Sequence, residues 1–393
     1  MQESPRLLNV DALRGFALLG ILSVNIWAFA DPWFASPAAN PSYDSALDHA
    51  VRFLVALLFE TKFYVLFSFL FGYSFTLQMD AADRAHTVFL PRMLRRQAGL
   101  IVLGLLHGAL LFYGDIMSLY GALGLVLLAC RHWQPERAAK TAVGLLSVMG
   151  CTWMLFALLL TNAGTAPPDP DALAKLQAFT GTAGATQAYH RGHLPEMLGI
   201  ILLLQAPTSM AMFLFGYAAG KVRLFEQPEL YREAARRVLA HGMPLGLGGA
   251  VCYAAASTYA PGGWLEVFCF GLGQLTAPLL TFSYVSAALL LFATPAGARI
   301  EHMLAPLGKM ALSNYLLQSL VLGLLFTGYG LRLINALPPL AVLACVPPLY
   351  ALQILLSAWW LRRHRYGPGE WLLRAATLAA IPPLRRDKHP RRR

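Results

Sequence analysis

Ten apolar runs, each long enough to cross a lipid bilayer, constrain the fold of this chain more than any other feature of its sequence. A spanning helix needs about 17–25 mostly apolar residues. Only 13% of the residues are charged, against about 25% in a soluble domain. The sequence therefore predicts an all-α, polytopic integral membrane bundle with helices near 11–30, 57–79, 97–114, 115–131, 140–162, 195–219, 240–259, 264–293, 304–327 and 339–361.

The distribution of Lys and Arg predicts how these helices are oriented. If the amino terminus is cytoplasmic, 26 of the 31 basic residues fall in cytoplasmic segments. The excess of Lys and Arg in cytoplasmic loops is the strongest topological signal in membrane proteins, so both termini are predicted to be cytoplasmic. We expect one transmembrane domain over 1–380 in the bacterial inner membrane, with outer loops near 31–56 and 163–194, and a disordered basic tail over 381–393. Part of the first loop, residues 46–58, is a candidate amphipathic helix.

The net charge of +11 indicates which partners to expect. The basic residues lie between apolar runs, where they orient helices and meet anionic lipid headgroups, so membrane lipids and not nucleic acid are the predicted partners. The five cysteines form no C-x-x-C pair. His190-x-x-His193 has helical metal spacing but no third ligand nearby, so no metal site is predicted.

Three polar residues share one face of the first predicted helix. Asp11 and Arg14 are three residues apart, so the carboxylate and the guanidinium can neutralise each other. Asn25 follows eleven residues after Arg14, three turns on. Polar and ionisable groups are costly within a membrane, which makes the three candidate substrate-binding residues. The alternative is a structural anchor at the helix entry.

His107 lies too deep in the third predicted helix to reach the membrane surface. Histidine is the side chain that titrates near neutral pH, so His107 is a candidate general base or proton relay. Asp115 follows two turns later and is expected to orient it or to cap the next helix. Lys62, at the same predicted depth, is expected to pair with Asp115. The alternative for His107 is a hydrogen-bonded packing residue.

Other polar residues are expected at the inner face and within two later helices. Arg92, Arg95 and Arg96 recur at spacings of three and one, on about one face, where they can bind phosphates or lipid headgroups. Asn314 and Gln318 are i, i+4 neighbours and candidate substrate-binding residues, although hydrogen bonds between helices would explain them equally well. Glu370 follows Gly-Pro-Gly and is expected to start a short interfacial helix.

A short internal repeat links two distant parts of the chain. Residues 69–73 read Phe-Leu-Phe-Gly-Tyr, and residues 213–217 read the same. Each copy ends an outside-to-inside predicted helix and precedes a basic cluster. Parallel repeats occur in transporters, but five matching residues also arise by chance in a chain built mostly from a few apolar residue types.

Several motifs together resemble the YeiB-like membrane family, defined by the domain of unknown function 418. They are Asp11-Ala12-Leu13-Arg14-Gly15-Phe16 with Val24-Asn25, Lys62-Phe63 with Leu70-Phe71-Gly72, His107 with Gly114-Asp115-Ile116, Met310-Ala311-Leu312-Ser313-Asn314-Tyr315 with Gln318, and Gly367-Pro368-x-Glu370-Trp371-Leu372. They cover nearly the whole chain and are specific in combination.

The first helix is also similar to that of wider transmembrane acyltransferase families, the type 3 acyltransferases and heparan-alpha-glucosaminide N-acetyltransferase. That similarity implies acyl transfer from cytoplasmic acyl-CoA to an acceptor across the membrane. This sequence departs from the type 3 pattern, because Asn25 stands where those proteins have a His eleven residues after the helix-1 Arg. The catalytic residue therefore cannot be carried over.

The leading hypothesis from the sequence is transmembrane acyl transfer. Arg14, Arg92, Arg95 and Arg96 would hold the phosphates of acyl-CoA. His107 would be the general base or a transient acyl carrier, and Asp115 or Lys62 would orient it or the unknown acceptor. The alternatives are a proton-coupled transporter of a small solute and a non-enzymatic membrane component.

Overall fold

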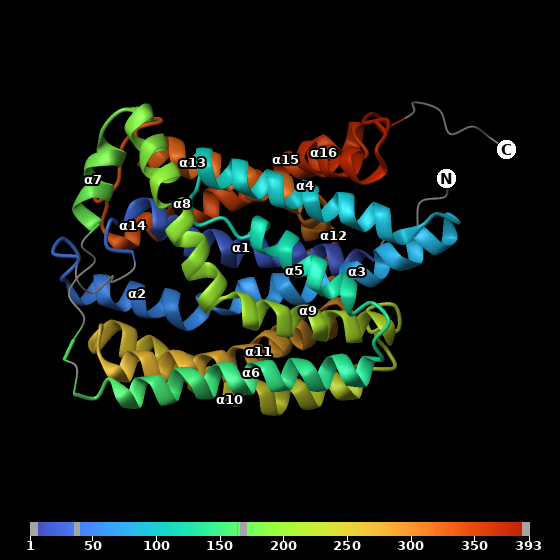
Figure 1. The fold of residues 1–393 in the computed structure, drawn as a ribbon, viewed down its shortest axis with the longest axis horizontal. Coiled ribbons are helices and arrows are strands. Elements are labelled where there is room, and N and C mark those ends of the chain that lie inside the picture. Colours follow the sequence, from blue (N-terminus) through green and yellow to red (C-terminus); the bar gives the residue numbers. More distant parts are fainter. Residues whose placement is uncertain (1–6, 35–39, 163, 166–170, 387–393) are drawn as a thin grey trace.

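The computed structural model describes residues 7–34, 40–162, 164–165 and 171–386, and it confirms an all-α fold (Figure 1). The regular elements in these ranges are all helices: α1 (Leu8–Ala30), α2 (Ala46–Leu58), α3 (Lys62–Arg84), α4 (Phe89–Leu110), α5 (Met117–Ala129), α6 (Pro135–Leu159), α7 (Ala172–Thr180), α8 (Ala183–Leu204), α9 (Ala206–Lys221), α10 (Arg232–Tyr259), α11 (Trp264–Phe292), α12 (Pro295–Lys309), α13 (Ala311–Phe326), α14 (Pro339–Ala344), α15 (Val346–Arg363) and α16 (Pro368–Leu378).

The described helices provide six candidate membrane spans, or eight if two bent pairs each count as one. The six are α1, α2 with α3, α6, α10, α11, and α14 with α15. The bent pairs are α8 with α9, at 56°, and α12 with α13, at 75°. The sequence predicted ten because it counted 97–114 and 115–131 separately. The first corresponds to α4, which has three arginines in its first two turns, and the second to α5, which has only 13 residues.

Exposed apolar side chains on the outer helices form the kind of surface that faces lipid. Val148, Leu155 and Leu159 of α6 are 67%, 62% and 75% exposed, and Leu245 of α10 is 62% exposed. Single exposed leucines are ordinary on soluble proteins, but a continuous apolar face along a helix of this length is typical of a membrane span. The chain is therefore a membrane protein.

Helix α1 lies in the middle of the bundle, and close packing holds it there (Figure 1). Leu13, Leu18, Leu22 and Trp27 of this helix are completely buried. A Cβ on Gly308 of α12 would lie 1.8 Å from the carbonyl oxygen of Asp11, so the two backbones touch. Small residues at helix contacts are the usual way to associate helices in lipid, where the hydrophobic effect does not drive association.

The two copies of the Phe-Leu-Phe-Gly-Tyr repeat pack directly against each other on α3 and α9. A Cβ on Gly72 would lie 2.0 Å from the carbonyl oxygen of Phe213, and a Cβ on Gly216 would lie 1.9 Å from that of Phe69. A Cβ on Gly220 would meet Thr76, at the same offset of 144 residues that relates the two copies. The helices are therefore parallel and in register. The glycine of each copy allows the backbone of the other copy to approach closely.

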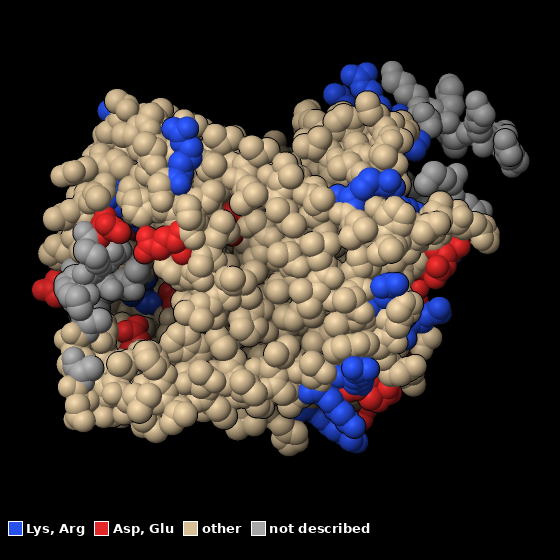
Figure 2. Space-filling model, in the orientation of Figure 1, with Lys and Arg blue, Asp and Glu red and all other residues tan. Residues whose placement is uncertain are grey.

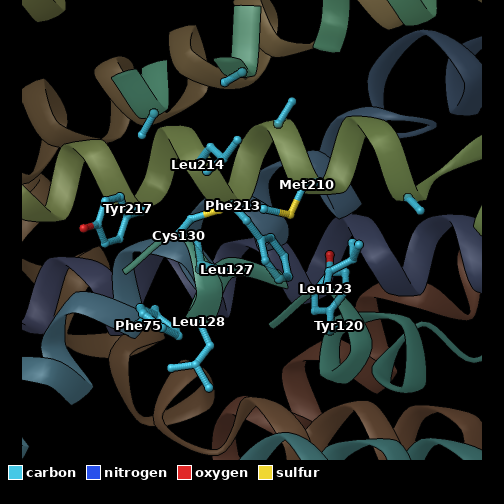
Figure 3. Packing of buried hydrophobic residues seen from close by; sticks show 14 of the residues in the cluster. Phe75, Tyr120, Leu123, Leu127, Leu128, Cys130, Met210, Phe213, Leu214 and Tyr217 are labelled. Atoms are coloured by element: carbon cyan, nitrogen blue, oxygen red, sulfur yellow. The ribbon is translucent and has the colours of Figure 1, made fainter. Parts of the chain in front are cut away.

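Helix α5 joins the same core from the other side, although it is too short to cross a membrane alone. Leu123 and Leu127 of α5 pack with Phe213, Leu214 and neighbouring side chains of α9 (Figure 3). The Tyr120 hydroxyl lies 2.7 Å from the Ser68 hydroxyl, which ties α5 to α3. One face of α5 is thus held by packing against the bundle.

Both segments predicted as outer loops contain helices among their described residues. Residues 46–58 form α2, in agreement with the candidate helix, and a capping box between Ser45 and Asp48 fixes its start. In the second segment α7 begins at Ala172, and α8 begins at Ala183, twelve residues before the predicted start. Thr182 caps α8 by accepting from the Ala185 N–H. The sequence contains this capping residue, but a prediction from hydropathy alone does not use it.

Both ends of the described chain lie at one end of the bundle, where α1 begins and α16 ends (Figure 1). On the face that Figure 2 shows, most Lys and Arg side chains gather at this same end. We refer to it as the basic end and to the opposite one as the far end. The predicted tail over 381–393 falls outside the described residues beyond position 386.

Candidate functional site

His107 and Asp115 form a completely enclosed pair between α4 and α5. His107 occupies the last turn of α4, and the short turn before α5 brings Asp115 back toward it. The Nδ1 atom of His107 lies 2.9 Å from Oδ1 of Asp115, and the two side chains are 1% and 0% exposed. The other carboxylate oxygen of Asp115 accepts from the Ser118 N–H at 2.9 Å. Asp115 therefore both orients His107 and caps α5.

This arrangement fixes the chemistry available at His107. An ionised carboxylate can only accept, so a neutral His107 that donates to Asp115 would hold its proton on Nδ1 and keep a lone pair on Nε2. Nε2 is buried and has no hydrogen-bond partner in the described part of the chain. The rings of Tyr315 and Phe112 lie beside it, with centroids 5.1 and 6.2 Å away. A buried histidine with an oriented ring and an unused nitrogen can act as a base or a nucleophile.

Lys62 does not pair with Asp115, contrary to the sequence prediction. It is 1% exposed, and its Nζ donates to the Ala56 carbonyl at 2.6 Å. The reason is the break between α2 and α3, where Thr61 adopts a positive φ of 67°. That break leaves carbonyl oxygens at the end of α2 without helical partners, and the negative end of a helix attracts a cation.

At the basic end, Arg14 and Arg96 lie close enough to interact electrostatically. Arg14 pairs with Asp11 at 2.8 Å and also donates to the Ser74 hydroxyl. The charges of Arg14, Glu370 and Arg374 act on the Arg96 guanidinium. Arg14 of α1 and Arg96 of α4 therefore lie on the same side of the bundle at its basic end, where both could act on one anion.

The neighbouring arginines are engaged with the protein. Arg95 donates to the Thr377 carbonyl at 3.1 Å, and Arg92 donates to the Thr87 hydroxyl at 2.6 Å. Arg92 and Arg96 line a cavity of about 10 Å³, enough for about one water molecule. Any larger anion at this place would require α4 and α16 to separate.

Glu370 caps the start of α13, at the bend between α12 and α13. Its carboxylate accepts from the backbone N–H groups of Leu312 and Ser313, at 2.7 and 3.2 Å, and from the Ser313 hydroxyl. Burial raises the pKa of the Glu370 carboxyl. Glu370 lies in the first turn of α16, as expected, and it also stabilises the start of α13, whose first N–H groups have no partner within the helix.

Asn314 and Gln318 join helices to one another. The Asn314 amide donates to the Ser357 hydroxyl at 2.9 Å, and the Gln318 amide donates to the Gln353 side chain at 3.0 Å and to the Leu18 carbonyl at 3.2 Å. These bonds connect α13 with α15 and α1, as the packing alternative supposed. Asn25, by contrast, is half-buried and makes no side-chain hydrogen bond within the described ranges.

Sequence reasoning missed a cluster of buried charges at the far end. Asp31 is 0% exposed, Lys175 is 3% exposed and Arg52 is 9% exposed. Lys175 donates to the Asp31 carbonyl at 3.0 Å, and the Arg52 guanidinium lies 4.4 Å from the Trp27 ring centroid. One Asp31 carboxylate oxygen and two Arg52 nitrogens are buried without partners in the described chain. Burial raises the pKa of Asp31 despite both cations.

His190 lies deep in α8 with no hydrogen bond to either ring nitrogen from the described residues. Its ring packs beside Tyr113 and Phe179, with centroids 5.6 and 5.4 Å away. His193 instead lies 3.7 Å from Asp171. No group of three potential metal ligands occurs among the residues that the structure describes. Figure 2 shows acidic and basic side chains around a hollow at this far end.

Comparison with known proteins places the chain among relatives of the same length. The model of a family described as protein of unknown function (DUF418) matches residues 219–380. The uncharacterized protein YxaH of Bacillus subtilis (strain 168) is 30% identical over 392 residues, covering 95% of each chain. The uncharacterized protein YeiB of Escherichia coli (strain K12) is 31% identical, covering 96% of this chain and 98% of YeiB. No solved structure matches.

Proposed function

The chain belongs to the YeiB-like family of membrane proteins, and we propose that it transfers an acyl group from cytoplasmic acyl-CoA to an acceptor on the outer side of the membrane. The observation that carries the proposal is the buried His107–Asp115 pair, whose Nε2 atom is left without a partner. In this proposal the membrane is the bacterial inner membrane, and the basic end faces the cytoplasm because Lys and Arg accumulate there.

In the proposed reaction the donor enters from the basic end. The phosphates of acyl-CoA would bind Arg14 of α1 and Arg96 of α4, whose charges act on each other. Arg95 and Arg92 would contribute after the small gap beside Arg96 opens. The acyl thioester would then extend along α1 and α4 toward His107, about eleven residues, or three turns, further along α4.

Two chemical routes are open to His107. In the first route Nε2 is the nucleophile: it attacks the thioester carbonyl, the C–S bond breaks, and CoA leaves as a thiolate. The acceptor hydroxyl or amine then attacks the acyl-imidazole and releases His107. The proton that the acceptor loses ends on the CoA sulfur. As a general base, Nε2 takes the acceptor proton while the acceptor attacks the thioester directly, and it returns that proton to the sulfur. In both routes Asp115 stabilises the proton on Nδ1.

The far-end cluster provides a polar site for the acceptor. Asp31, Arg52 and Lys175 are buried there, with several polar atoms unused. Such groups are costly to bury without partners, so an acceptor or water that binds them gains their unused hydrogen bonds. Asn25 lies on the outer half of α1, between this cluster and Arg14, and is free to contact a substrate.

Acyl transfer is tested with purified protein in lipid nanodiscs, radiolabelled acetyl-CoA and a thiol reagent that detects released CoA. We expect CoA release by the wild-type protein and none by His107→Gln. The matched control is His302→Gln, because His302 is exposed on α12. Label retained on the protein would identify the acyl-carrier route. Equal CoA release by wild type and His107→Gln would reject the proposal.

The bent helix pairs favour a second candidate, proton-coupled transport. Transporters commonly bind substrate where spanning helices are interrupted, and both α8–α9 and α12–α13 are bent here. His107 would then carry the coupled proton. Solute-dependent proton uptake by proteoliposomes, with no CoA release, would support transport over acyl transfer.

A further inference from the structure

A large apolar cavity lies at the basic end, on the side of the bundle away from His107. Its volume is about 440 Å³, within the range of ligand-binding pockets. Most of its lining comes from the first turns of α6 and α10, the end of α9, the connection between α9 and α10, and the last third of α11, and Phe69 of α3 completes it. The segments of α6, α9, α10 and α11 share one end of the bundle, which places the cavity near the membrane surface and not at its centre.

The walls of the cavity suit a hydrocarbon chain. Three of its lining residues are Phe69, Phe215 and Phe282, and the Phe282 ring meets the other two edge to face, with centroids 5.5 and 5.4 Å away. Alanines make up much of the remaining wall, among them Ala219 and Ala235. Small side chains leave room for a chain to lie along the helices, and no charged side chain except Glu136 lines the space.

Basic residues alternate along the chain with several residues that line the cavity. The segments 135–140 and 221–237, which contribute part of its lining, contain seven Lys and Arg residues and four Glu residues, a net charge of +3. Three of the glutamates are paired with neighbouring arginines: Glu226 with Arg223, Glu229 with Arg232, and Glu233 with Arg237. Lys221 lies over the Tyr217 ring, and exposed Arg236 follows the lining residue Ala235. Figure 2 shows Lys and Arg gathered at this corner.

We infer that this cavity binds one anionic phospholipid of the inner leaflet, with an acyl chain inserted among Phe69, Phe215 and Phe282 and the headgroup held by the basic residues around Lys221 and Arg236. An apolar cavity of this size gains free energy from a hydrocarbon chain in place of water. Basic residues near the surface favour anionic over zwitterionic headgroups. The inference does not depend on acyl transfer, because the lipid occupies a different side of α3.

Native mass spectrometry of the full chain, equilibrated with equal amounts of phosphatidylglycerol and phosphatidylcholine, tests this inference. We expect the wild-type protein to retain one phosphatidylglycerol. Ala235→Trp, which fills the cavity, should lose it. Ala240→Trp is the matched control, because Ala240 is an exposed residue on the same helix that does not line the cavity.

A second variant keeps the test decisive if Ala235→Trp does not fold. Lys221→Gln with Arg236→Gln changes only exposed residues, and it should lower the preference for phosphatidylglycerol over phosphatidylcholine by at least about tenfold. An unchanged preference in this variant, equal retention of both lipids by the wild type, or a dimer that Ala235→Trp dissociates would each overturn the inference.

Discussion

Replacing Gly216 by alanine tests how the two repeat copies pack. The added Cβ would lie 1.9 Å from the Phe69 carbonyl oxygen and 2.7 Å from the Tyr73 nitrogen, both backbone atoms that cannot rotate away. A carbon normally approaches a carbonyl oxygen no closer than about 3.3 Å, so α3 and α9 must separate locally by about 1.4 Å. A gap of 0.5–1 Å already forfeits about a quarter to a half of the dispersion attraction of the contacting atoms.

The expected cost follows from these two opposing effects. Overpacking a tight contact typically costs about 1–3 kcal/mol, while alanine in place of glycine returns up to about 1 kcal/mol of helix propensity. Gly216→Ala should therefore lower the thermal unfolding temperature in detergent, and Gly72→Ala should do the same at the reciprocal contact.

Gly144→Ala is the control for this prediction. A Cβ on Gly144 of α6 meets no atom within 4 Å, so the same substitution should leave the unfolding temperature unchanged or raise it. If Gly216→Ala and Gly144→Ala unfolded at the same temperature as the wild type, the two copies could not be in backbone contact.

Three further predictions concern topology, the dyad and pH. Leu173→Cys, at an exposed position of α7, should react with a membrane-impermeant maleimide in intact cells; reaction only after lysis would reverse the proposed orientation. His107→Gln and Asp115→Asn should be non-additive in unfolding free energy, with a coupling of about 0.5–3 kcal/mol, whereas additive effects would mean that the pair does not form. Burial raises the pKa of Glu370, so the folded state binds its proton more tightly than the unfolded state does. Wild-type stability relative to Glu370→Gln should then fall as pH rises above the ordinary glutamate pKa, and a stability difference that rises with pH would contradict the burial.

Local relations in the sequence predicted local geometry well. Asp11 and Arg14 are one turn apart and form the expected ion pair. His107 and Asp115 are eight residues apart, across a single turn between helices, and they also meet. In both cases the intervening chain is too short to carry the partners far from each other.

Relations between distant segments could not be read in this way. The expected pair of Lys62 and Asp115 rested on equal depth in the membrane, and depth does not say which helix face a side chain occupies. The buried cluster of Asp31, Arg52 and Lys175 assembles from three segments separated by about 20 and 120 residues, and nothing in the local pattern of any segment points to the others. The count of ten spans exceeds the six to eight candidates among the described helices for a related reason, because hydropathy does not show that the apolar α5 has only 13 residues.

Binding of acyl-CoA to the purified protein tests the proposed function most directly, because it needs no knowledge of the acceptor. A ligand present at about 100 times its Kd adds about 2.7 kcal/mol to the unfolding free energy. Millimolar acetyl-CoA should therefore raise the unfolding temperature of the wild type and of His107→Gln, and the rise should shrink with increasing salt and be lost in Arg96→Ala. No shift in the wild type at millimolar acetyl-CoA, or an equal shift in Arg96→Ala, would contradict a cytoplasmic acyl-CoA site between Arg14 and Arg96.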